Sequence, residues 1–200
     1  MKDKFEEFLK DSELNIKTIG RNDEHSDTHR YPYEPTTYSV LERLCDSEYL
    51  AESDTVVDYG CGMGRVPIYL NHKIGCKGIG VELVESFYEK ACENAKSSGC
   101  AEQVQFVLTA AEQYKLPEEV SACFFFNPFD LGILRGVMKQ ILASYDSRPR
   151  RIRLFFYYPQ MKYIAFLSSI PDLMFVDEVD YMDLFEEQDE RNRIVIFETV

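Results

Sequence analysis

Strand-like and helix-like segments alternate along most of this chain, from Thr55 to Ser169. Short runs rich in branched and aromatic residues predict strands at 55–59, 77–83, 104–109, 120–127 and 151–158. Segments with apolar residues at helical spacing lie between and after them, at 65–72, 84–97, around 134–142 and at 160–169. Such alternation places successive strands in parallel and sends helices across both faces, so it predicts a doubly wound α/β fold with a mostly parallel sheet.

The two ends of the chain depart from this alternation. Near the C-terminus, LMFVDEVDYM and NRIVIFETV are strand-like runs joined by acidic residues without a helix, which predicts an antiparallel hairpin. Residues 1–10 predict an amphipathic helix with Phe5, Phe8 and Leu9 on one side, residues 11–35 are polar and irregular, and residues 36–50 predict a second helix. We therefore expect a single domain over 1–200, with an N-terminal arm or lid at 1–35 and a core at 36–200.

The composition limits the setting in which this chain works. Its 200 residues are 45% hydrophobic, which is enough for a sizeable core. No segment has the length and apolarity of a membrane span, the charged N-terminus is unlike a signal peptide, and the six cysteines are scattered without metal-binding spacing. These features predict a cytoplasmic protein with reduced cysteines, no metal and no membrane partner.

The net charge of −13 opposes passive binding to a phosphate backbone. A local basic stretch can override the overall sign, and RPRRIR at 148–153 is the strongest candidate. The alternative is that this stretch is a solvated entry to the strand that follows it. The charge therefore favours a protein or a small molecule as the partner and leaves RNA open.

The first predicted strand ends in a glycine-rich turn, within VVDYGCGMGRVPIYL at 56–70. A strand that leads through glycines into a helix is a common way to hold a nucleotide. Dinucleotide sites space their glycines as GxGxxG, whereas Gly60, Gly62 and Gly64 follow GxGxG, two residues after Asp58. This spacing, together with the short helix that follows, disfavours a nicotinamide oxidoreductase.

The segment D-Y-G-C-G-M-G, residues 58–64, resembles the first motif of the class I S-adenosylmethionine-dependent methyltransferases. The resemblance covers roughly residues 36–200, including the terminal hairpin. It implies a Rossmann-like core with seven strands in the order 3-2-1-4-5-7-6, the last of them antiparallel. It also implies S-adenosylmethionine as the cofactor, methyl transfer as the activity, and Cys61 as part of the cofactor-binding turn.

The polar ends of the first two strands suit this cofactor. S-adenosylmethionine has no pyrophosphate, so the glycines serve to bring the backbone close to its methionine and ribose parts. We assign Asp58 to its cationic groups, the alternative being that Asp58 caps the turn. Glu82 ends the second strand and is expected to accept both ribose hydroxyls, unless it is only an exposed strand-end acid.

Three residues are assigned to the adenine. Leu83, next to Glu82, would pack against the ring. By resemblance, Ala111 would give a backbone amide and Glu112 would accept from the adenine amino group, both within T-A-A-E at 109–112. The alternative for Glu112 is an ordinary acid at the start of a helix.

The fourth strand ends in FFFNPFD at 124–130, where the reactive methyl group should point. This segment resembles the [ND]-P-P-[YF] motif of methyltransferases that act on planar amino nitrogens. There the polar side chain accepts from the amino group and the aromatic ring stacks, so Asn127 and Phe129 are the candidate catalytic residues, and Asn127 also borders the cofactor. Only one proline is present and Asp130 takes the usual aromatic place, which leaves nitrogen specificity open. Asn-Pro as a simple turn is the alternative.

The N-terminal arm contains HRYPYEPTTY at 29–38. Its tyrosines Tyr31, Tyr33 and Tyr38 either form a lid over the site or pack the arm onto the core. His25 and His29 are candidate bases or ordinary surface residues.

Arg65, directly after the glycines, either pairs with a carboxylate near the site or is solvated at the start of its helix. The methyl acceptor stays open among protein, small molecule and RNA. A non-catalytic sensor or partner subunit that binds the cofactor or its demethylated product is the second functional hypothesis. The Asn-Pro-Phe segment disfavours it, because such a protein would not need one.

Overall fold

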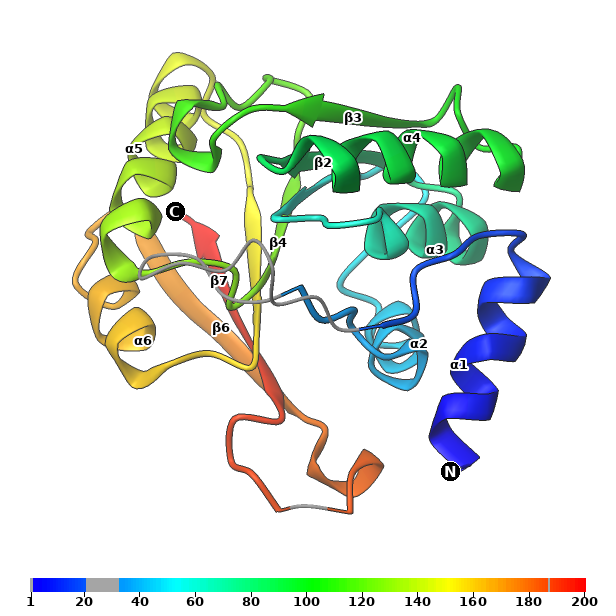
Figure 1. Ribbon diagram of the computed structural model, residues 1–200. Helices are drawn as coiled ribbons and strands as arrows, with labels where there is room; N and C mark the ends of the chain where they lie inside the picture. The colour runs from blue at the N-terminus through cyan, green and yellow to red at the C-terminus, as the bar shows by residue number, and fades with distance from the viewer. Residues whose placement is uncertain (1, 21–32, 187) are drawn as a thin grey trace.

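The computed structural model describes residues 2–20, 33–186 and 188–200, and its centre is a seven-stranded sheet (Figure 1). The strand order is β3-β2-β1-β4-β5-β7-β6, and β7 runs antiparallel to both of its neighbours. The order and the antiparallel last strand confirm the predicted fold. The strands are β1 (Thr55–Tyr59), β2 (Lys77–Glu82), β3 (Val104–Leu108), β4 (Ala122–Phe126), β5 (Arg153–Tyr157), β6 (Leu173–Asp180) and β7 (Arg193–Thr199).

Strand β1 is the point from which the chain builds the sheet in two directions. Its five residues are all buried, and it pairs in parallel with β2 on one side and with β4 on the other. Ligands of open α/β sheets bind beyond the carboxyl ends of the strands at such a switch point. The fold therefore places the candidate site beyond Tyr59 of β1 and Phe126 of β4.

Helices cover both faces of the sheet (Figure 1). Successive residues of β1 enter different halves of the core, because side chains alternate along a strand. Val56 joins the side chains of α2 and α3, whereas Val57 joins those of α5 and α6. The helices are α2 (Tyr38–Asp46), α3 (Arg65–Ile74), α4 (Glu85–Ser98), α5 (Leu131–Ser147) and α6 (Met161–Leu167), with short 3-10 turns η1 (Ala111–Gln113) and η2 (Met182–Leu184).

Strand β6 forms one edge of the sheet, because β7 lies between it and β5. The pairing of β6 with β7 shifts register between Phe175 and Asp177, which marks a bulge in the edge strand. Three of the last four residues of β6 are acidic: Asp177, Glu178 and Asp180.

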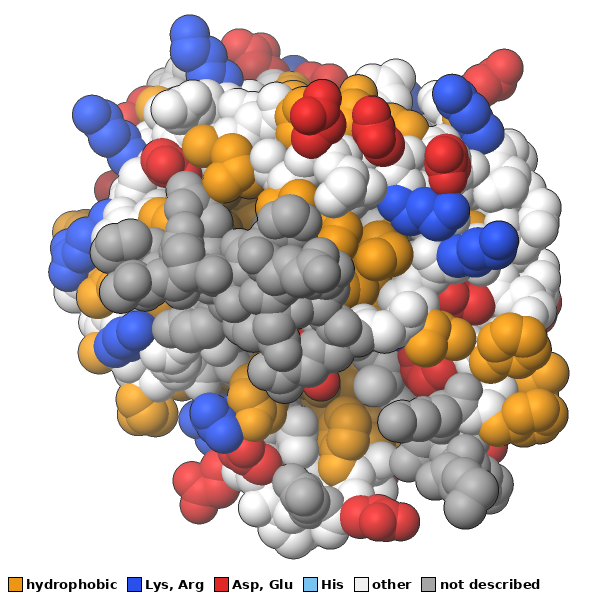
Figure 2. Space-filling model, viewed as in Figure 1, with side chains coloured by type: hydrophobic (Ala, Val, Ile, Leu, Met, Phe, Trp, Pro, Cys, Tyr) orange, Lys and Arg blue, Asp and Glu red, His pale blue; other side chains and the backbone are white. Residues whose placement is uncertain are grey.

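Helix α1 (Lys2–Glu13) attaches to the core through acidic side chains rather than through its apolar side. Phe5, Phe8 and Leu9 were predicted on one side of this helix, and they are 63%, 57% and 48% exposed. Figure 2 shows hydrophobic side chains gathered over α1 at the right of the view. The opposite side of α1 carries Glu7 and Asp11, which face the core.

Arg65, the first residue of α3, receives these two acids. Its guanidinium is 2% exposed and forms ion pairs with Glu7 and with Asp11, the latter at 3.3 Å. It also donates to Thr18 Oγ1 at 2.7 Å and lies 4.3 Å from the centre of the Tyr38 ring. Arg65 was expected either to pair with a carboxylate near the site or to be solvated, and the structure shows it paired. Its partners Glu7 and Asp11 belong to the N-terminal arm.

Replacing Arg65 with methionine is expected to destabilise the protein by about 3–5 kcal/mol, because Glu7 and Asp11 lose their buried partner. Urea unfolding followed by circular dichroism measures the change. The control is Arg43→Met, which breaks the surface pair with Asp183 at 2.5 Å and should cost about 0–1 kcal/mol. Equal losses in the two variants would contradict this account of α1.

Candidate active site

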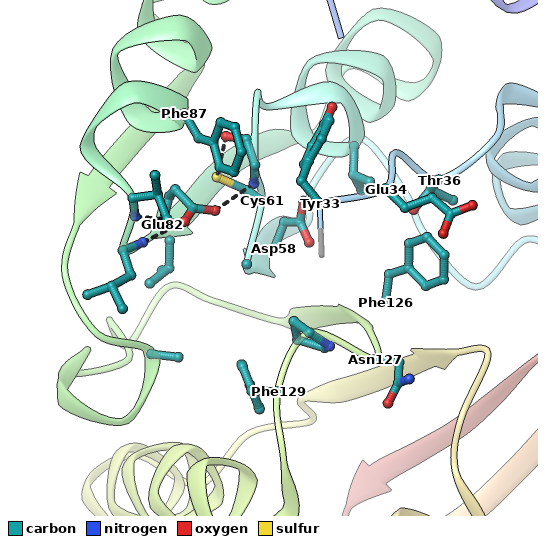
Figure 3. A pocket seen from close by; sticks show the side chains of 18 of the residues that line it. Tyr33, Glu34, Thr36, Asp58, Cys61, Glu82, Phe87, Phe126, Asn127 and Phe129 are labelled. Atoms are coloured by element: carbon teal, nitrogen blue, oxygen red, sulfur yellow. Dashed lines mark hydrogen bonds between the residues drawn. The ribbon is translucent and has the colours of Figure 1, made fainter. Parts of the chain in front are cut away.

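A pocket opens beyond the carboxyl ends of β1, β2 and β4 (Figure 3). Its walls come from the turn after β1, the ends of β2 and β3, the segment after β4, and residues 33–36 of the arm. The fold thus brings together sites that are far apart in the sequence. All predicted site residues except Gly64 line this pocket, namely Asp58, Gly60, Cys61, Gly62, Glu82, Leu83, Ala111, Glu112, Asn127 and Phe129.

The turn after β1 requires glycine for both its backbone shape and its close contacts. Gly60 has a φ of +78°, and a Cβ there would lie 2.7 Å from Pro128 Cβ. Gly62 has a φ of +53°, and a Cβ there would overlap the ring of Tyr33. L-residues with side chains rarely adopt such angles. Gly64 is the N-cap of α3 and lies against Phe106, behind the turn.

Asp58 is the most unusual carboxylate of the pocket. It is 4% exposed and, within the ranges that the structure describes, its side chain has no hydrogen-bond partner, so it does not cap the turn. Burial raises the pKa of Asp58 to about 8, and the negative charge of Glu82 adds to the increase. A positively charged group beside this carboxylate would stabilise its ionised form and so lower its pKa again.

Glu82 joins the turn after β1 to the start of α4. Its Oε2 accepts from the amide of Gly62 at 2.8 Å, and its Oε1 accepts from those of Leu83 and Val84 at 2.8 and 2.9 Å. The side chain is buried, so the alternative of an exposed strand-end acid does not describe it. Leu83 is 42% exposed and lines the pocket, as a residue that packs against a ligand must.

The turn η1 contributes the wall that was assigned to the adenine. Ala111 and Glu112 both line the pocket there. Glu112 also contacts α5, since a Cβ on Gly136 would lie 2.6 Å from Glu112 Cβ, and its carbonyl accepts from Gln140 Nε2 at 3.2 Å. Thr109 lines the same wall, and its amide donates to the carbonyl of Glu82 at 2.9 Å.

Asn127 follows β4 in a strained backbone conformation, with a φ of +39°. Its side-chain Oδ1 accepts from Gln160 Nε2 at 2.8 Å, which ties the end of β4 to the start of α6. Figure 3 shows the Asn127 side chain pointing away from Asp58. A direct contact of this amide with a substrate stays a prediction.

Phe129 lies deeper than a stacking residue at a pocket mouth would. It is 4% exposed, and its ring meets that of Phe125 edge to face with centroids 6.4 Å apart. Its stacking role stays a prediction as well. Asp130, which occupies the usual aromatic place of the motif, is the N-cap of α5 and accepts from the amide of Ile133 at 3.0 Å.

The arm reaches the pocket through Tyr33. Its ring lies on Gly62 and 5.1 Å from the ring of Phe87, and its hydroxyl donates to the carbonyl of Thr18 at 2.7 Å. Tyr33 therefore both packs the arm onto the core and covers the turn. His25, His29 and Tyr31 lie outside the described residues.

Among the pocket residues that sequence reasoning missed are Glu34, Phe87 and Phe126. Phe87 had been placed only on the apolar side of its helix, and Phe126 read as an ordinary strand residue. Glu34 belongs to the arm, so only its place in the Tyr-Pro-Tyr-Glu-Pro stretch beside the core could have marked it.

The structure also provides observations on metal ions, disulfide bonds and membrane-spanning helices. Among the described residues, no group of histidine, cysteine, aspartate and glutamate is arranged to hold a metal ion. All six cysteines are free thiols. None of the helices in the described part of the chain is long and apolar enough to cross a bilayer.

Arg150, one of the four arginines in the basic stretch at 148–153, is held by backbone carbonyls. Its side chain donates to the carbonyls of Val120 at 2.9 Å, Pro117 at 3.1 Å and Ser144 at 3.1 Å. It thus closes the loop before β4 against the end of α5.

Known proteins are similar to this chain in the sequence of one part of it and in the fold. Residues 56–145 match the family model of a methyltransferase domain. A protein-lysine N-methyltransferase from Saccharolobus islandicus is 30% identical over 77 residues, which are 38% of this chain and 48% of that protein. The match thus spans about half the length of this curated relative.

Two solved structures extend the likeness to most of the chain. An RNA methyltransferase from Salinibacter ruber in complex with S-adenosyl-L-homocysteine has 21% identity and a TM-score of 0.57, with 83% of this chain and 92% of that chain covered. An S-adenosylmethionine-dependent methyltransferase from Thiobacillus denitrificans in the same complex has 20% identity and a TM-score of 0.56, with 86% and 93% covered. The chain is therefore similar to a methyltransferase domain over residues 56–145, and it shares the fold of these two solved methyltransferases over most of its length.

Proposed function

We propose that this chain is an S-adenosylmethionine-dependent methyltransferase that transfers the methyl group to an amino nitrogen. Asp58 carries the proposal, because it is a buried carboxylate without a hydrogen-bond partner among the described residues, in a pocket walled by glycines. A buried acid of this kind is stabilised by a cationic ligand. S-adenosylmethionine carries an ammonium and a sulfonium group, so the residues present fit it.

The remaining walls divide between the other parts of the cofactor. Gly60 and Gly62 would border the methionine and ribose parts, with Cys61 between them. Glu82 would hold the ribose hydroxyls while its backbone contacts keep the turn in place. Leu83 would pack on the adenine.

The far wall of the nucleoside end comes from η1. Ala111 would offer its amide to the adenine ring, and Glu112 would accept from the adenine amino group. Both line the pocket, as Leu83 does.

When bound, the cofactor supplies an electrophilic methyl group on a positively charged sulfur. The task left to the chain is to hold the acceptor nitrogen in line with that methyl group and to exclude water. Asn127 and Phe129, after β4, are the residues we propose for it. Asn127, braced by Gln160, would accept from the acceptor's amino group, and Phe129 would form the apolar wall beside it.

Two observations support nitrogen as the acceptor atom. The Asn-Pro-Phe segment resembles a motif of nitrogen methyltransferases, and the relative from Saccharolobus islandicus is named for lysine N-methylation. The net charge of −13 favours a protein or a small molecule over RNA as the bearer of that nitrogen.

Calorimetric titration with S-adenosylmethionine, S-adenosylhomocysteine and NADH tests the cofactor. We expect micromolar binding of the first two and none of NADH. Formation of S-adenosylhomocysteine in the presence of amine acceptors then tests the activity. Binding without transfer to any protein, small molecule or RNA would instead support the non-catalytic sensor.

Replacing Asp58 with asparagine is expected to weaken S-adenosylmethionine binding at pH 8 by about tenfold to a hundredfold, because a charge-assisted contact is lost. Calorimetry at that pH measures the change. Asp130→Asn is the matched control, since asparagine is an equally good N-cap and should leave binding within about twofold. Similar losses in both variants would argue against a cofactor role for Asp58.

The raised pKa of Asp58 also predicts opposite pH dependences of stability and affinity. Its pKa rises from 3.8 to about 8 on folding, so the stability it contributes is full below pH 3.8 and is lost as pH rises through about 8. Cofactor affinity should increase over the upper part of this range, because the cationic ligand needs the ionised carboxylate. At pH 7, calorimetry in two buffers of different ionisation enthalpy should detect the release of nearly one proton on binding. Asp58→Asn should release none, and a wild-type protein that releases none would refute this protonation state.

Gly62→Ala is expected to abolish detectable cofactor binding, because the new Cβ meets the ring of Tyr33 and strains a positive φ. Gly99→Ala is the control, since Gly99 has a φ of +79° but open space around it. That variant should lose about 1 kcal/mol of stability and keep its affinity. Thermal unfolding and titration on both variants separate the two effects.

A further inference from the structure

Tyr33 of the arm enters the part of the pocket that is assigned to the cationic groups of the cofactor. Its ring lies directly on Gly62, where a Cβ would overlap it. Both residues line the pocket together with Asp58, and Figure 3 shows Tyr33 beside Asp58. A side chain from outside the core thus lies at the place where the proposed ligand has its positive charge.

The electrostatic surroundings of Tyr33 agree with this placement. Burial raises the pKa of the Tyr33 hydroxyl above its ordinary value. The charge of Arg65 opposes this increase, whereas the charges of Asp11 and Asp58 add to it. Tyr33 therefore lies within electrostatic reach of one carboxylate of the arm, Asp11, and one carboxylate of the core, Asp58.

An aromatic ring beside a buried carboxylate is suited to a cation. Asp58 is 4% exposed and has no hydrogen-bond partner in the described part of the chain. The face of an aromatic ring attracts ligand cations, and the attraction increases where water is excluded. Arg65 lines the same pocket, but its charge is paired with Glu7 and Asp11. The ring of Tyr33 and the carboxylate of Asp58 can thus contact the same ligand cation.

A chain of hydrogen bonds connects Tyr33 to helix α1. The Tyr33 hydroxyl donates to the carbonyl of Thr18 at 2.7 Å. The hydroxyl and the amide of Thr18 donate to the two oxygens of Asp11 at 2.7 and 2.5 Å, and the amide of Ile19 donates to Asp11 at 3.2 Å. Asp11 in turn pairs with Arg65, which directly follows the glycine turn, at 3.3 Å. The buried carboxylate of Asp11 therefore sets the position of Tyr33 relative to the core.

We propose that Tyr33 is a cofactor-binding residue whose ring contacts the cationic end of S-adenosylmethionine beside Asp58, and that Asp11 is the positioning residue that holds it there. The proposal rests on the cofactor assignment made above and adds the arm to the cofactor site. Its consequence is that docking of the arm and binding of the cofactor are linked. A docked arm binds the cofactor more tightly, and a bound cofactor stabilises the docked arm by the same factor.

Three ligands distinguish a contact with the cation from mere support of the glycine turn. They are S-adenosylmethionine, S-adenosylhomocysteine, which lacks the sulfonium charge, and 5′-methylthioadenosine, which has neither cationic group. Tyr33→Leu should weaken the binding of S-adenosylmethionine about tenfold and leave that of 5′-methylthioadenosine within about twofold, as measured by calorimetry. A loss shared by S-adenosylhomocysteine identifies the ammonium as the group contacted, and a loss confined to S-adenosylmethionine identifies the sulfonium, so either result supports the proposal.

Tyr33→Phe is the conservative variant. It keeps the aromatic ring and loses only the hydrogen bond to Thr18. We expect it to bind S-adenosylmethionine within about threefold of the wild-type protein, because the ring is the group in contact with the cation. Equal losses in Tyr33→Phe and Tyr33→Leu would place the effect in the hydroxyl and would overturn the ring contact.

Asp11→Asn tests the positioning role, because it removes the charge that faces Arg65. It should weaken S-adenosylmethionine binding about threefold to tenfold and leave 5′-methylthioadenosine within about twofold. Combined with Tyr33→Leu it should add less than about twofold to the loss of that variant, since both changes remove the same contact. Glu13→Gln is the matched control on the same helix, because Glu13 pairs only at the surface with Lys10, at 3.7 Å, and should change neither affinity.

Hydrogen exchange measures the same linkage from the side of the arm. The amides of Thr18 and Ile19 both donate to Asp11, so their exchange requires that the arm opens there. Saturating S-adenosylmethionine should slow the exchange of these two amides about tenfold in the wild-type protein. It should not slow their exchange in Tyr33→Leu, and 5′-methylthioadenosine should not slow it in either protein.

The outcomes separate this proposal from the one on which it rests. Absence of S-adenosylmethionine binding to the wild-type protein would overturn both. Binding that is unchanged in Tyr33→Leu, or weakened equally for all three ligands, would overturn the cation contact and leave the cofactor assignment intact. Exchange of Thr18 and Ile19 that the cofactor does not slow would overturn the linkage between the arm and the site.

Discussion

The carboxylate of Glu82 holds together the two loops on which the pocket is built. It accepts hydrogen bonds from the turn after β1, through Gly62, and from the two residues that lead into α4, Leu83 and Val84. The turn has positive φ angles that few residues tolerate, so it depends on contacts from outside itself. Glu82 supplies such a contact through Gly62. The turn can therefore consist largely of glycines, whose small size leaves room for a ligand beside the backbone.

A carboxylate–cation network brings the N-terminal arm to the same pocket. Arg65 follows the glycine turn directly and binds Glu7 and Asp11 of α1. Asn94 of α4 adds contacts to both the arm and the turn, at 3.0 Å to the amide of Lys17 and at 2.9 Å to the carbonyl of Met63. The arm is therefore part of the pocket wall and not an appendage, and Tyr33 is the side chain through which it covers the turn.

Local patterns in the sequence were sufficient to predict the strands and helices of the core, because each pattern reflects burial within one element. The strand order came from the family resemblance, and the structure confirms it. Contacts between segments that lie far apart in the sequence could not be predicted from these local patterns. The phenylalanines of α1 marked an amphipathic helix, yet the helix docks by Glu7 and Asp11, since the partner that decides its orientation is 54 residues away in Arg65. Phe126 and Glu34 likewise become neighbours of one pocket only after folding.

The edge strand β6 has features that oppose the addition of a further strand to the sheet. An exposed edge offers unpaired amides and carbonyls to any other strand, and β6 also exposes Met174 and Phe175. Its bulge between Phe175 and Asp177 breaks the straight row of hydrogen-bonding groups, and Asp177, Glu178 and Asp180 follow at once. Two such edges brought together would set acid against acid along a kinked strand. The edge strand β6 is thus poorly suited to pairing with the same strand of a second copy.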